Sequence, residues 1–314
     1  MPEHKLSLLS PLRYPGSKHA LVDYIEDFLR ANSFVGREWV EPCAGGASVA
    51  LSLLSRGLVT RATIVEKDPL IYAFWKSVKT DAAVLCQIVR ELDVSVATWE
   101  QFQKYRCRDA AKRFPSIELG LAGLFFNRVN YSGILGAKPI GGMDQTSPYK
   151  IDCRFTKSTV IDRIVDAAKV MDRVTVILGD VVSYLRRSRL RLSKGNSVVY
   201  IDPPYYRQGK KLYRYHFNDR DHIRLARFLN GANFPWLVSY DNDPFVVDLF
   251  RGQTVRPIWL QYTVREARRA DELLITNQDH LPLHAAREQV LPDEKELLAR
   301  GPVARLRIRR STAA

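Results

Sequence analysis

The sequence has few residues that could bind a metal or cross-link the chain. Its 314 residues include four cysteines without close spacing, Cys43, Cys86, Cys107 and Cys153, and six scattered histidines. Zinc sites and disulfide scaffolds both require such residues in dense, regular arrangements. We therefore expect no metal site and no disulfide framework, and a reducing cytoplasm is the predicted location.

Long apolar segments are also missing. The longest uncharged apolar stretch, Leu119 to Phe126, is far shorter than the ~20 residues that a membrane-spanning helix needs. Residues 1–10 (MPEHKLSLLS) lack the apolar core of a secretory signal, so no membrane partner is expected. The hydrophobic fraction of 46% and the charged fraction of 26% are typical of globular proteins, and the length allows about two domains.

The sequence has fewer acidic than basic residues. The sequence contains 34 Asp and Glu against 48 Lys and Arg, which gives a net charge of +14 and an isoelectric point near 9.7. Residues 184–194 (YLRRSRLRLSK) carry five cations, residues 207–214 (RQGKKLYR) carry four, and residues 305–310 form a third basic run. One such run is often only a solvated face, but several in one chain favour a polyanionic partner such as nucleic acid.

The first third of the chain alternates between strand and helix patterns. Apolar residues at helical spacing predict a helix over 18–31, and a short strand ending at Trp39 and Val40 leads into the turn EPCAGG. A helix is expected over 47–58, and a second strand over 62–65 ends at Glu66. This order is typical of the βαβ unit of a nucleotide-binding sheet.

The alternation is interrupted in the middle of the chain. Residues 75–114 are helix-like, and residues 118–126 lead into an irregular, glycine-rich stretch at 127–142. Apolar strand patterns then return at 174–178, 198–201 and 236–239.

One α/β domain with an insert accounts for this pattern. We predict a catalytic domain in two parts, residues 1–75 and 161–278, interrupted by a mainly helical insert at 76–160. A basic extension at 279–314 is expected to contain a helix over 292–300.

The tetrapeptide Asp202-Pro203-Pro204-Tyr205 follows an apolar strand, at the end of the strand where open α/β sheets bind ligands. Its prolines lack amide donors, so the Pro203 carbonyl and the Asp202 carboxylate could accept both hydrogens of one amino group. An aryl amine is a poor nucleophile because its lone pair is delocalised into the ring. Two acceptors on its hydrogens localise that lone pair on nitrogen, and they act most strongly as positive charge develops. Tyr205 offers a face on which a planar base stacks. A proline-terminated strand with a surface aspartate is the alternative interpretation.

Residues 41–48 (EPCAGGAS) and Glu66 have features of a nucleoside-binding site. Glycines allow a ligand to approach the backbone at the N-terminus of the following helix. Glu66 stands about twenty residues further on, where an acid accepts hydrogen bonds from ribose hydroxyls. An ordinary tight turn and a solvent-facing acid would give the same pattern.

Four motifs occur in a fixed order: RYPGSK at 13–18, EPCAGG at 41–46, EKD at 66–68 and DPPY at 202–205. Together they resemble the motifs of Dam-like, class alpha, adenine-specific DNA methyltransferases of the D12 family, and DELLITN at 271–277 is similar to that family's closing strand. The resemblance spans residues 12–277. It implies a Rossmann-like α/β sheet that binds S-adenosylmethionine and carries an inserted target-recognition domain.

The resemblance also implies a site and a reaction. A methyl group would pass from S-adenosylmethionine to the 6-amino group of adenine in double-stranded DNA, after the base is flipped from the duplex and without a metal. Glu66 would bind the cofactor's ribose and Asp180 would lie near its adenine. The implied cofactor contacts are Tyr14, Gly16, Lys18, Glu41, Ala44, Gly45, Glu66 and Asp180, and the implied catalytic residues are Asp202, Pro203 and Tyr205.

The insert supplies candidates for sequence recognition. Arg128, Asn130 and Tyr131 lie in a glycine-bounded segment with the composition of a loop that enters a DNA groove. Internal bracing of the loop by Asn127 and Arg128 is the alternative. Members of the family that read GATC carry a basic residue where Gly136 stands here, so a different recognition sequence is expected.

The remaining expectations concern partners and rival functions. Arg186, Arg187 and Arg189 suit contacts with DNA phosphates. A cognate restriction or defence nuclease is a candidate partner, and the sequence does not indicate an oligomeric state. Methylation of cytosine, RNA adenine or protein glutamine is one rival, although the RNA and glutamine enzymes usually carry asparagine in place of Asp202. A DNA-recognition module without catalysis is another, which the intact DPPY motif disfavours.

Overall fold

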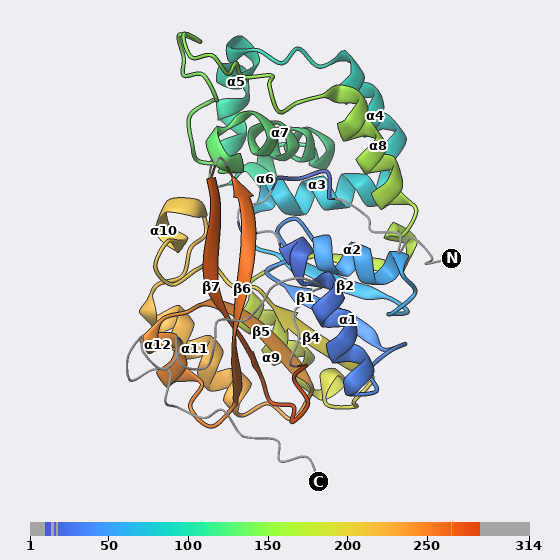
Figure 1. Ribbon diagram of the computed structural model, residues 1–314. Helices are drawn as coiled ribbons and strands as arrows, with labels where there is room; N and C mark the ends of the chain where they lie inside the picture. The colour runs from blue at the N-terminus through green and yellow to red at the C-terminus, as the bar shows by residue number, and fades with distance from the viewer. Residues whose placement is uncertain (1–9, 14–15, 17, 108, 265, 283–314) are drawn as a thin grey trace, which may run out of the picture.

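The chain folds around one sheet of seven strands in the order β3-β2-β1-β4-β5-β7-β6 (Figure 1). The computed structural model describes residues 10–13, 16, 18–107, 109–264 and 266–282, apart from the side chains of 259–271. The first five strands are parallel, whereas β7 runs antiparallel to both β5 and β6. This topology confirms the predicted Rossmann-like α/β sheet. The strands are β1 (Glu38–Pro42), β2 (Ala62–Glu66), β3 (Val174–Leu178), β4 (Ser197–Ile201), β5 (Trp236–Asp241), β6 (Thr254–Val264) and β7 (Glu266–Thr276).

Helices cover both faces of the parallel strands, as a parallel sheet requires. Side chains alternate along a strand, so Tyr200 of β4 lies in one core while Val199 and Ile201 lie in the other. The first core lies under α1 (Val22–Ala31), α2 (Ser48–Ser55) and α3 (Pro69–Thr80). The second lies under α9 (Val181–Leu192), α11 (Asp219–Asn230) and α12 (Pro244–Leu249).

Residues between α3 and β3 form a helical layer at the top of Figure 1. Phe125 and Phe126 of this layer share a core with Trp75 of α3, so it does not have a separate core. Both predicted boundaries, at 75/76 and 160/161, fall inside helices, α3 and α8. The helices are α4 (Ala82–Glu91), α5 (Val96–Phe102), α6 (Ala110–Arg113), α7 (Ser116–Val129) and α8 (Lys157–Ala168), with short turns η2 (Gln103–Arg106), η3 (Tyr131–Gly133) and η4 (Met171–Arg173).

Most elements expected from the sequence are present with shifted ends. The helix expected over 18–31 is a 3-10 turn, η1 (Lys18–Leu21), followed by α1, and basic residues 207–214 contain the short helix α10 (Gly209–Leu212). The sequence pattern did not reveal β6. The helix predicted over 292–300 lies outside the described residues. Within the described residues, no helix is long and apolar enough to span a membrane, and no three or more His, Cys, Asp or Glu side chains are grouped to hold a metal.

Helices α3 and α7 pack closely because two glycines of α7 face the backbone of α3. A Cβ atom at Gly123 of α7 would lie 2.5 Å from the carbonyl oxygen of Leu70, and one at Gly120 would lie 2.8 Å from that of Ala73. Both distances are shorter than real Cβ contacts, so a larger residue would push the insert away from α3.

We expect Gly123→Ala to lower the free energy of unfolding by about 1–3 kcal/mol, although alanine is the better helix former. Urea denaturation measures the change. Gly231→Ala is the matched control, because Gly231 has a φ of −100° and its Cβ would lie 3.8 Å from the nearest backbone oxygen. The control should stay within about 0.5 kcal/mol of wild type. Equal stabilities for the two variants would contradict close packing of α3 on α7.

Candidate functional site

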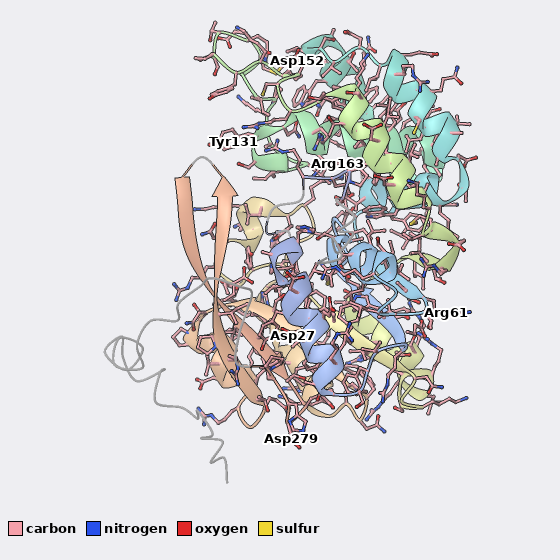
Figure 2. All side chains as sticks on the ribbon, turned by 45° about the vertical axis from the view of Figure 1, so that its right-hand side comes forward. Asp27, Arg61, Tyr131, Asp152, Arg163 and Asp279 are labelled. Atoms are coloured by element: carbon pink, nitrogen blue, oxygen red, sulfur yellow. The ribbon has the colours of Figure 1, made fainter. Side chains whose placement is uncertain are left out.

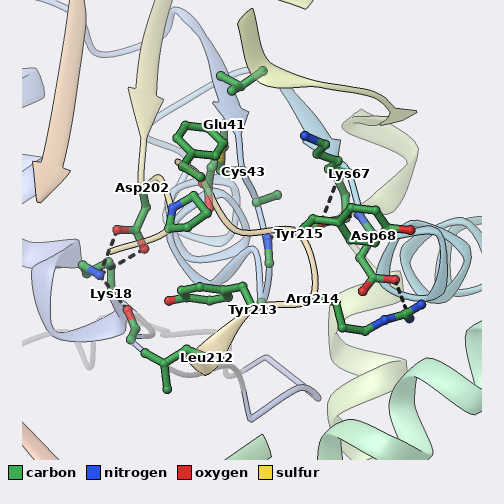
Figure 3. Close-up of a pocket in the computed structure, with 18 of the residues that line it drawn as sticks. Lys18, Glu41, Cys43, Lys67, Asp68, Asp202, Leu212, Tyr213, Arg214 and Tyr215 are labelled. Carbon is green, nitrogen blue, oxygen red and sulfur yellow. Dashed lines mark hydrogen bonds and ion pairs between the residues drawn. The ribbon is translucent and has the colours of Figure 1, made fainter. Parts of the chain in front are cut away.

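A pocket lies at the edge of the sheet where β1, β2, β3 and β4 end (Figure 3). The parallel topology brings together residues from distant parts of the sequence, because the carboxyl ends of the strands meet at this edge. Tyr14 lies outside the described residues, Pro203 is buried, and Tyr205 is not part of the pocket lining. The predicted site residues that line the pocket are Gly16, Lys18, Glu41, Ala44, Gly45, Glu66, Asp180 and Asp202.

Glu66, at the end of β2, holds the glycine turn in place. Its Oε2 accepts a hydrogen bond from the amide of Gly45 at 2.9 Å, and its Oε1 accepts from the amides of Lys67 and Asp68 at 2.8 Å each. Gly45 has a φ of 46°, in the left-handed region that favours glycine. Burial raises the pKa of Glu66 to about 7, against the effect of these hydrogen bonds. Glu66 therefore shapes the loop and also faces the pocket.

Glu41, at the end of β1, is a second buried carboxyl in the pocket wall. Its Oε2 accepts hydrogen bonds from the Trp39 indole and from the Ala50 amide, both at 2.9 Å. Its Oε1 accepts none from any residue that the structure describes. Burial raises the pKa of Glu41 to about 8. A cation entering the pocket would favour the ionised form.

Asp180, just beyond β3, caps helix α9 by accepting a hydrogen bond from the Ser183 amide at 3.0 Å. Lys67 Nζ and Arg224 Nη2 each lie 3.5 Å from its Oδ2. Burial alone would raise the pKa of Asp180, but the hydrogen bonds from Ser183 and the two cations lower it. Asp180 therefore brings a stable negative charge to the rim of the pocket.

Asp202 is held at the end of β4 by a buried polar network. Lys18 Nζ lies 2.8 Å from Oδ1 and 3.0 Å from Oδ2 of Asp202, and the Ser239 hydroxyl donates to Oδ1 at 2.8 Å. Ser239 is in turn 2.9 Å from the Tyr200 hydroxyl. Asp202 is therefore both oriented and electrostatically paired, and its carboxylate faces the pocket (Figure 3).

Tyr205 and Glu272 complete this network on the other side of Lys18. The Tyr205 hydroxyl donates to Glu272 Oε1 at 2.7 Å, and Lys18 Nζ lies 3.2 Å from the Tyr205 oxygen and 3.7 Å from Glu272 Oε1. A Cβ at Gly16 would lie 2.8 Å from that same hydroxyl, so the glycine allows the N-terminal motif to pack against Tyr205.

Sequence reasoning missed three groups around the pocket. Ser239 and Glu272 lie on β5 and β7, and they reach Asp202 or its partners only through the order of strands in the sheet. Arg214 lines the pocket and donates to Asp68 at 3.2 Å and to the Arg106 carbonyl at 3.1 Å. The basic composition of residues 207–214 marked this segment only as a charged run, although it links the pocket to the insert.

The insert residues predicted to contact DNA differ in exposure. Tyr131 is 57% exposed, whereas Arg128 is 5% exposed and Asn130 is fully buried. Asn130 Oδ1 accepts from the Trp99 indole at 2.8 Å, and its Nδ2 donates to the Ile134 carbonyl at 3.0 Å. In this structure Asn130 braces the loop and does not present its amide to solvent, because Trp99 of α5 and the loop carbonyl of Ile134 use that amide.

Arg186, Arg187 and Arg189 are exposed on α9. The helix starts at the pocket and ends near the amino end of β1, where Arg191 pairs with Glu38. Its 12 residues span about 18 Å, so this basic run leads away from Asp202. Two of its arginines join three from α11 to line a groove, formed by Arg186, Arg189, Arg220, Arg224 and Arg227.

The sheet is that of a Rossmann-like fold with a pocket at its strand ends, and the family match identifies a methyltransferase built on it. More specifically, the chain belongs to the D12 class N6 adenine-specific DNA methyltransferase family, which matches residues 14–264. The function expected from the sequence, adenine methylation in DNA by an S-adenosylmethionine-dependent enzyme, is confirmed at the level of the family.

The chain is also similar to individual proteins of known sequence or structure. Type II methyltransferase M.MjaIII from Methanocaldococcus jannaschii is 25% identical over 296 residues, which cover 85% of this chain and 98% of that protein. Among solved structures, the rRNA methyltransferase aviRa from Streptomyces viridochromogenes shares 14% identity, covers 88% of this chain and 93% of its own, and has a TM-score of 0.38. The C-terminal domain of precorrin-6Y C5,15-methyltransferase from Rhodobacter capsulatus shares 9% identity, covers 86% and 98%, and has a TM-score of 0.35.

The family and fold imply that the chain uses S-adenosylmethionine, and the pocket fits its charge. The methionine portion of this cofactor carries an ammonium and a sulfonium cation. The pocket is lined by several carboxyls at strand ends, and among the described residues Glu41 and Glu66 have only neutral N–H groups as hydrogen-bond donors. The left-handed turn at Gly45 brings backbone rather than side chain to the pocket wall.

Cofactor affinity should depend on pH because Glu41 must lose its proton to pair with a cation. Its pKa is about 8 without ligand, so the affinity should rise with pH by at most about tenfold per unit and level off above pH 8. Glu41→Gln should remove the part of this rise nearest pH 8 and leave the part due to Glu66, whose pKa is about 7. Calorimetric titration with S-adenosylmethionine from pH 6 to 9 tests this. An unchanged pH profile in Glu41→Gln would assign the binding of the cation to another group.

Proposed function

We propose that the target adenine flips out of the duplex and enters the pocket beside Asp202, with S-adenosylmethionine held by the residues at the ends of β1, β2 and β3. The position of Asp202 at the pocket wall, paired with Lys18 and Ser239, is the observation that carries this proposal. When bound, the cofactor supplies a methyl group attached to a sulfonium sulfur, and that sulfur is the leaving group, as a neutral thioether.

Asp202 acts as an acceptor for the amino group rather than as a strong base. Lys18 Nζ lies within 3.0 Å of both Asp202 oxygens, so the carboxylate is already oriented and paired with a cation. Asp202 and the Pro203 carbonyl accept the two amino hydrogens, which directs the nitrogen lone pair towards the methyl carbon. Both acceptors act most strongly as positive charge develops on nitrogen. The excess proton then passes to solvent.

Lys18 and Glu272 are positioning residues in this proposal. The ammonium of Lys18 sits between Asp202 and Glu272, while Glu272 fixes the Tyr205 hydroxyl. This arrangement holds the tyrosine ring next to the acceptor that binds the amino group. Tyr205 is then placed for stacking on the flipped base once the base has entered.

Asp202→Ala should reduce methyl transfer by about a hundredfold or more, because one preorganised electrostatic partner of the transition state is lost. Binding of S-adenosylmethionine, measured by calorimetry, should change by less than about twofold. The matched control is Asp248→Asn, an exposed aspartate whose ion-pair partner among the described residues is Arg251. Labelled methyl transfer to genomic DNA gives the rate. Near-normal turnover in Asp202→Ala would overturn the mechanism.

Recognition of DNA is divided in this proposal between the insert and helix α9. Tyr131 is exposed at the insert loop and suits contact with a groove, whereas Arg186, Arg187 and Arg189 suit phosphates away from the target base. The recognition sequence, a partner nuclease and a cytoplasmic location remain predictions.

Substitutions in these two sets of residues should have different effects on DNA binding and methylation. Arg186→Gln with Arg189→Gln should weaken binding to all sequences and flatten the slope of log affinity against log salt by about 0.9 per lost phosphate contact. Tyr131→Ala should instead change which genomic sites are methylated and leave the salt slope unaltered. Salt titrations together with sequencing of methylated DNA measure both effects. A change of site choice in the arginine variant alone would reverse these roles.

A further inference from the structure

Four arginines gather where the insert meets the N-terminal segment. They are Arg13, Arg128 in the last turn of α7, Arg154, and Arg163 of α8. Arg163 Nη1 donates to the Ser10 carbonyl at 3.4 Å, and Figure 2 shows this side chain at the junction of the insert with the rest of the chain. No carboxylate among the described residues lies within ion-pair distance of any of the four.

Arg128 is the unusual member of this group. Its side chain is buried, and its Nε is enclosed without a hydrogen-bond partner. No hydrogen bond or ion pair joins its guanidinium to a described residue. The Nη1 of Arg13 is also buried without a hydrogen-bond partner. Unpaired buried donors of this kind are rare in native proteins and usually mark a place for water or an ion.

Repulsion between the arginines adds to the free-energy cost of burying the charge of Arg128. Burial, together with the neighbouring charges of Arg163, Arg13 and Arg154, lowers the pKa of Arg128 to about 10. Arg106, another partly buried arginine of the insert, also has an unpaired Nε, but its Nη1 donates to Gln103 at 2.8 Å and its guanidinium lies 4.0 Å from the centre of the Phe126 ring. An anion supplied from outside would give the Arg128 guanidinium comparable partners.

The arginine cluster adjoins the methyltransferase pocket. Asn127 Oδ1 accepts a hydrogen bond from the Arg13 amide at 2.6 Å, and Asn127 Nδ2 donates to the Gly133 carbonyl at 3.1 Å. A Cβ at Gly133 would lie 2.1 Å from the Arg13 carbonyl oxygen, so the two segments are in contact. Gly133 itself lines the pocket. An anion bound at the cluster would therefore lie near the place where the target base enters.

We propose that Arg13, Arg128, Arg154 and Arg163 form a binding site for a phosphate of the DNA backbone close to the target nucleotide. The guanidinium fork matches phosphate oxygens in pairs, and four cations exceed what a carboxylate would need. The proposal rests on the proposed function in one respect: the target strand must reach the pocket. A free phosphate ion has the same chemistry, and the experiment separates the two sources.

The first test compares stability with DNA binding. Arg128→Met removes an unpaired buried charge, so the melting temperature should stay the same or rise by roughly 2–4 °C. Its affinity for short random-sequence duplexes, measured by fluorescence anisotropy, should fall about tenfold. Arg106→Met is the matched control and should lower the melting temperature, because that arginine has partners to lose. A clear fall in the melting temperature of Arg128→Met would show a purely structural role and overturn the proposal.

The second test changes the rim of the cluster, Arg154 and Arg163, which are less buried than Arg128, so that the substitutions disturb the fold less. Arg154→Gln with Arg163→Gln should flatten the salt slope of duplex binding by about 0.9 for one lost phosphate contact. The control, Arg61→Gln with Arg90→Gln, removes the same charge from exposed positions elsewhere and should leave the slope unchanged. S-adenosylmethionine binding should be normal in both variants, so a failure of this proposal is distinct from a failure of the cofactor site.

Inorganic phosphate distinguishes the two sources of the anion. At matched ionic strength, phosphate should raise the melting temperature of wild type more than chloride does, and the rim variant should lose this difference. Stabilisation by phosphate without any change in the salt slope for DNA would overturn the assignment to the DNA backbone. Equal salt slopes in both double variants, together with no effect of phosphate, would overturn the site itself.

Discussion

The ion pair between Lys18 and Asp202 is the contact on which the geometry of the site depends. It joins residues 184 positions apart and fixes the N-terminal motif to the end of β4. The Lys18 side chain is only 2% exposed and also faces Glu272 at 3.7 Å. The ammonium thus lies between the two carboxylates. Lys18 therefore fixes the position of Asp202 as well as that of Tyr205.

Charge is separated in this molecule between the pocket and the outer surface. The chain as a whole carries +14, yet the pocket gathers Glu41, Glu66, Asp180 and Asp202 from the ends of four parallel strands. An acidic pocket suits a cofactor with a sulfonium cation. The basic surface suits a polyanion. The two ligands of the reaction are thus matched by opposite charges in different parts of one fold.

The sequence predicts those pocket residues that lie at the ends of strands. Glu41, Glu66, Asp180 and Asp202 each follow an apolar strand, and parallel topology then places them at one edge. Strand β6 was missed because Pro257 interrupts its pattern, and proline is tolerated there since β6 is an edge strand.

Side-chain partners that depend on strand order could not be predicted. Ser239 and Glu272 contact Asp202 and Tyr205 because β4, β5 and β7 are neighbours, and no local pattern encodes that order. Asn130 shows the limit for loops. The composition of the loop favoured a DNA contact, whereas in the structure the Asn130 amide bonds to Trp99 of α5 and to the Ile134 carbonyl.

Two buried groups of opposite charge have pKa values shifted towards the neutral form, and they lie in different parts of the fold. Glu41 faces the pocket with a raised pKa, and Arg128 lies behind the pocket rim with a lowered one. In each case burial favours the neutral form, and a partner of opposite charge would restore the ionised form. A core optimised only for stability would replace both by apolar residues. Their presence is understandable if the fold is completed electrostatically by its ligands, with a cation arriving on one side and DNA on the other.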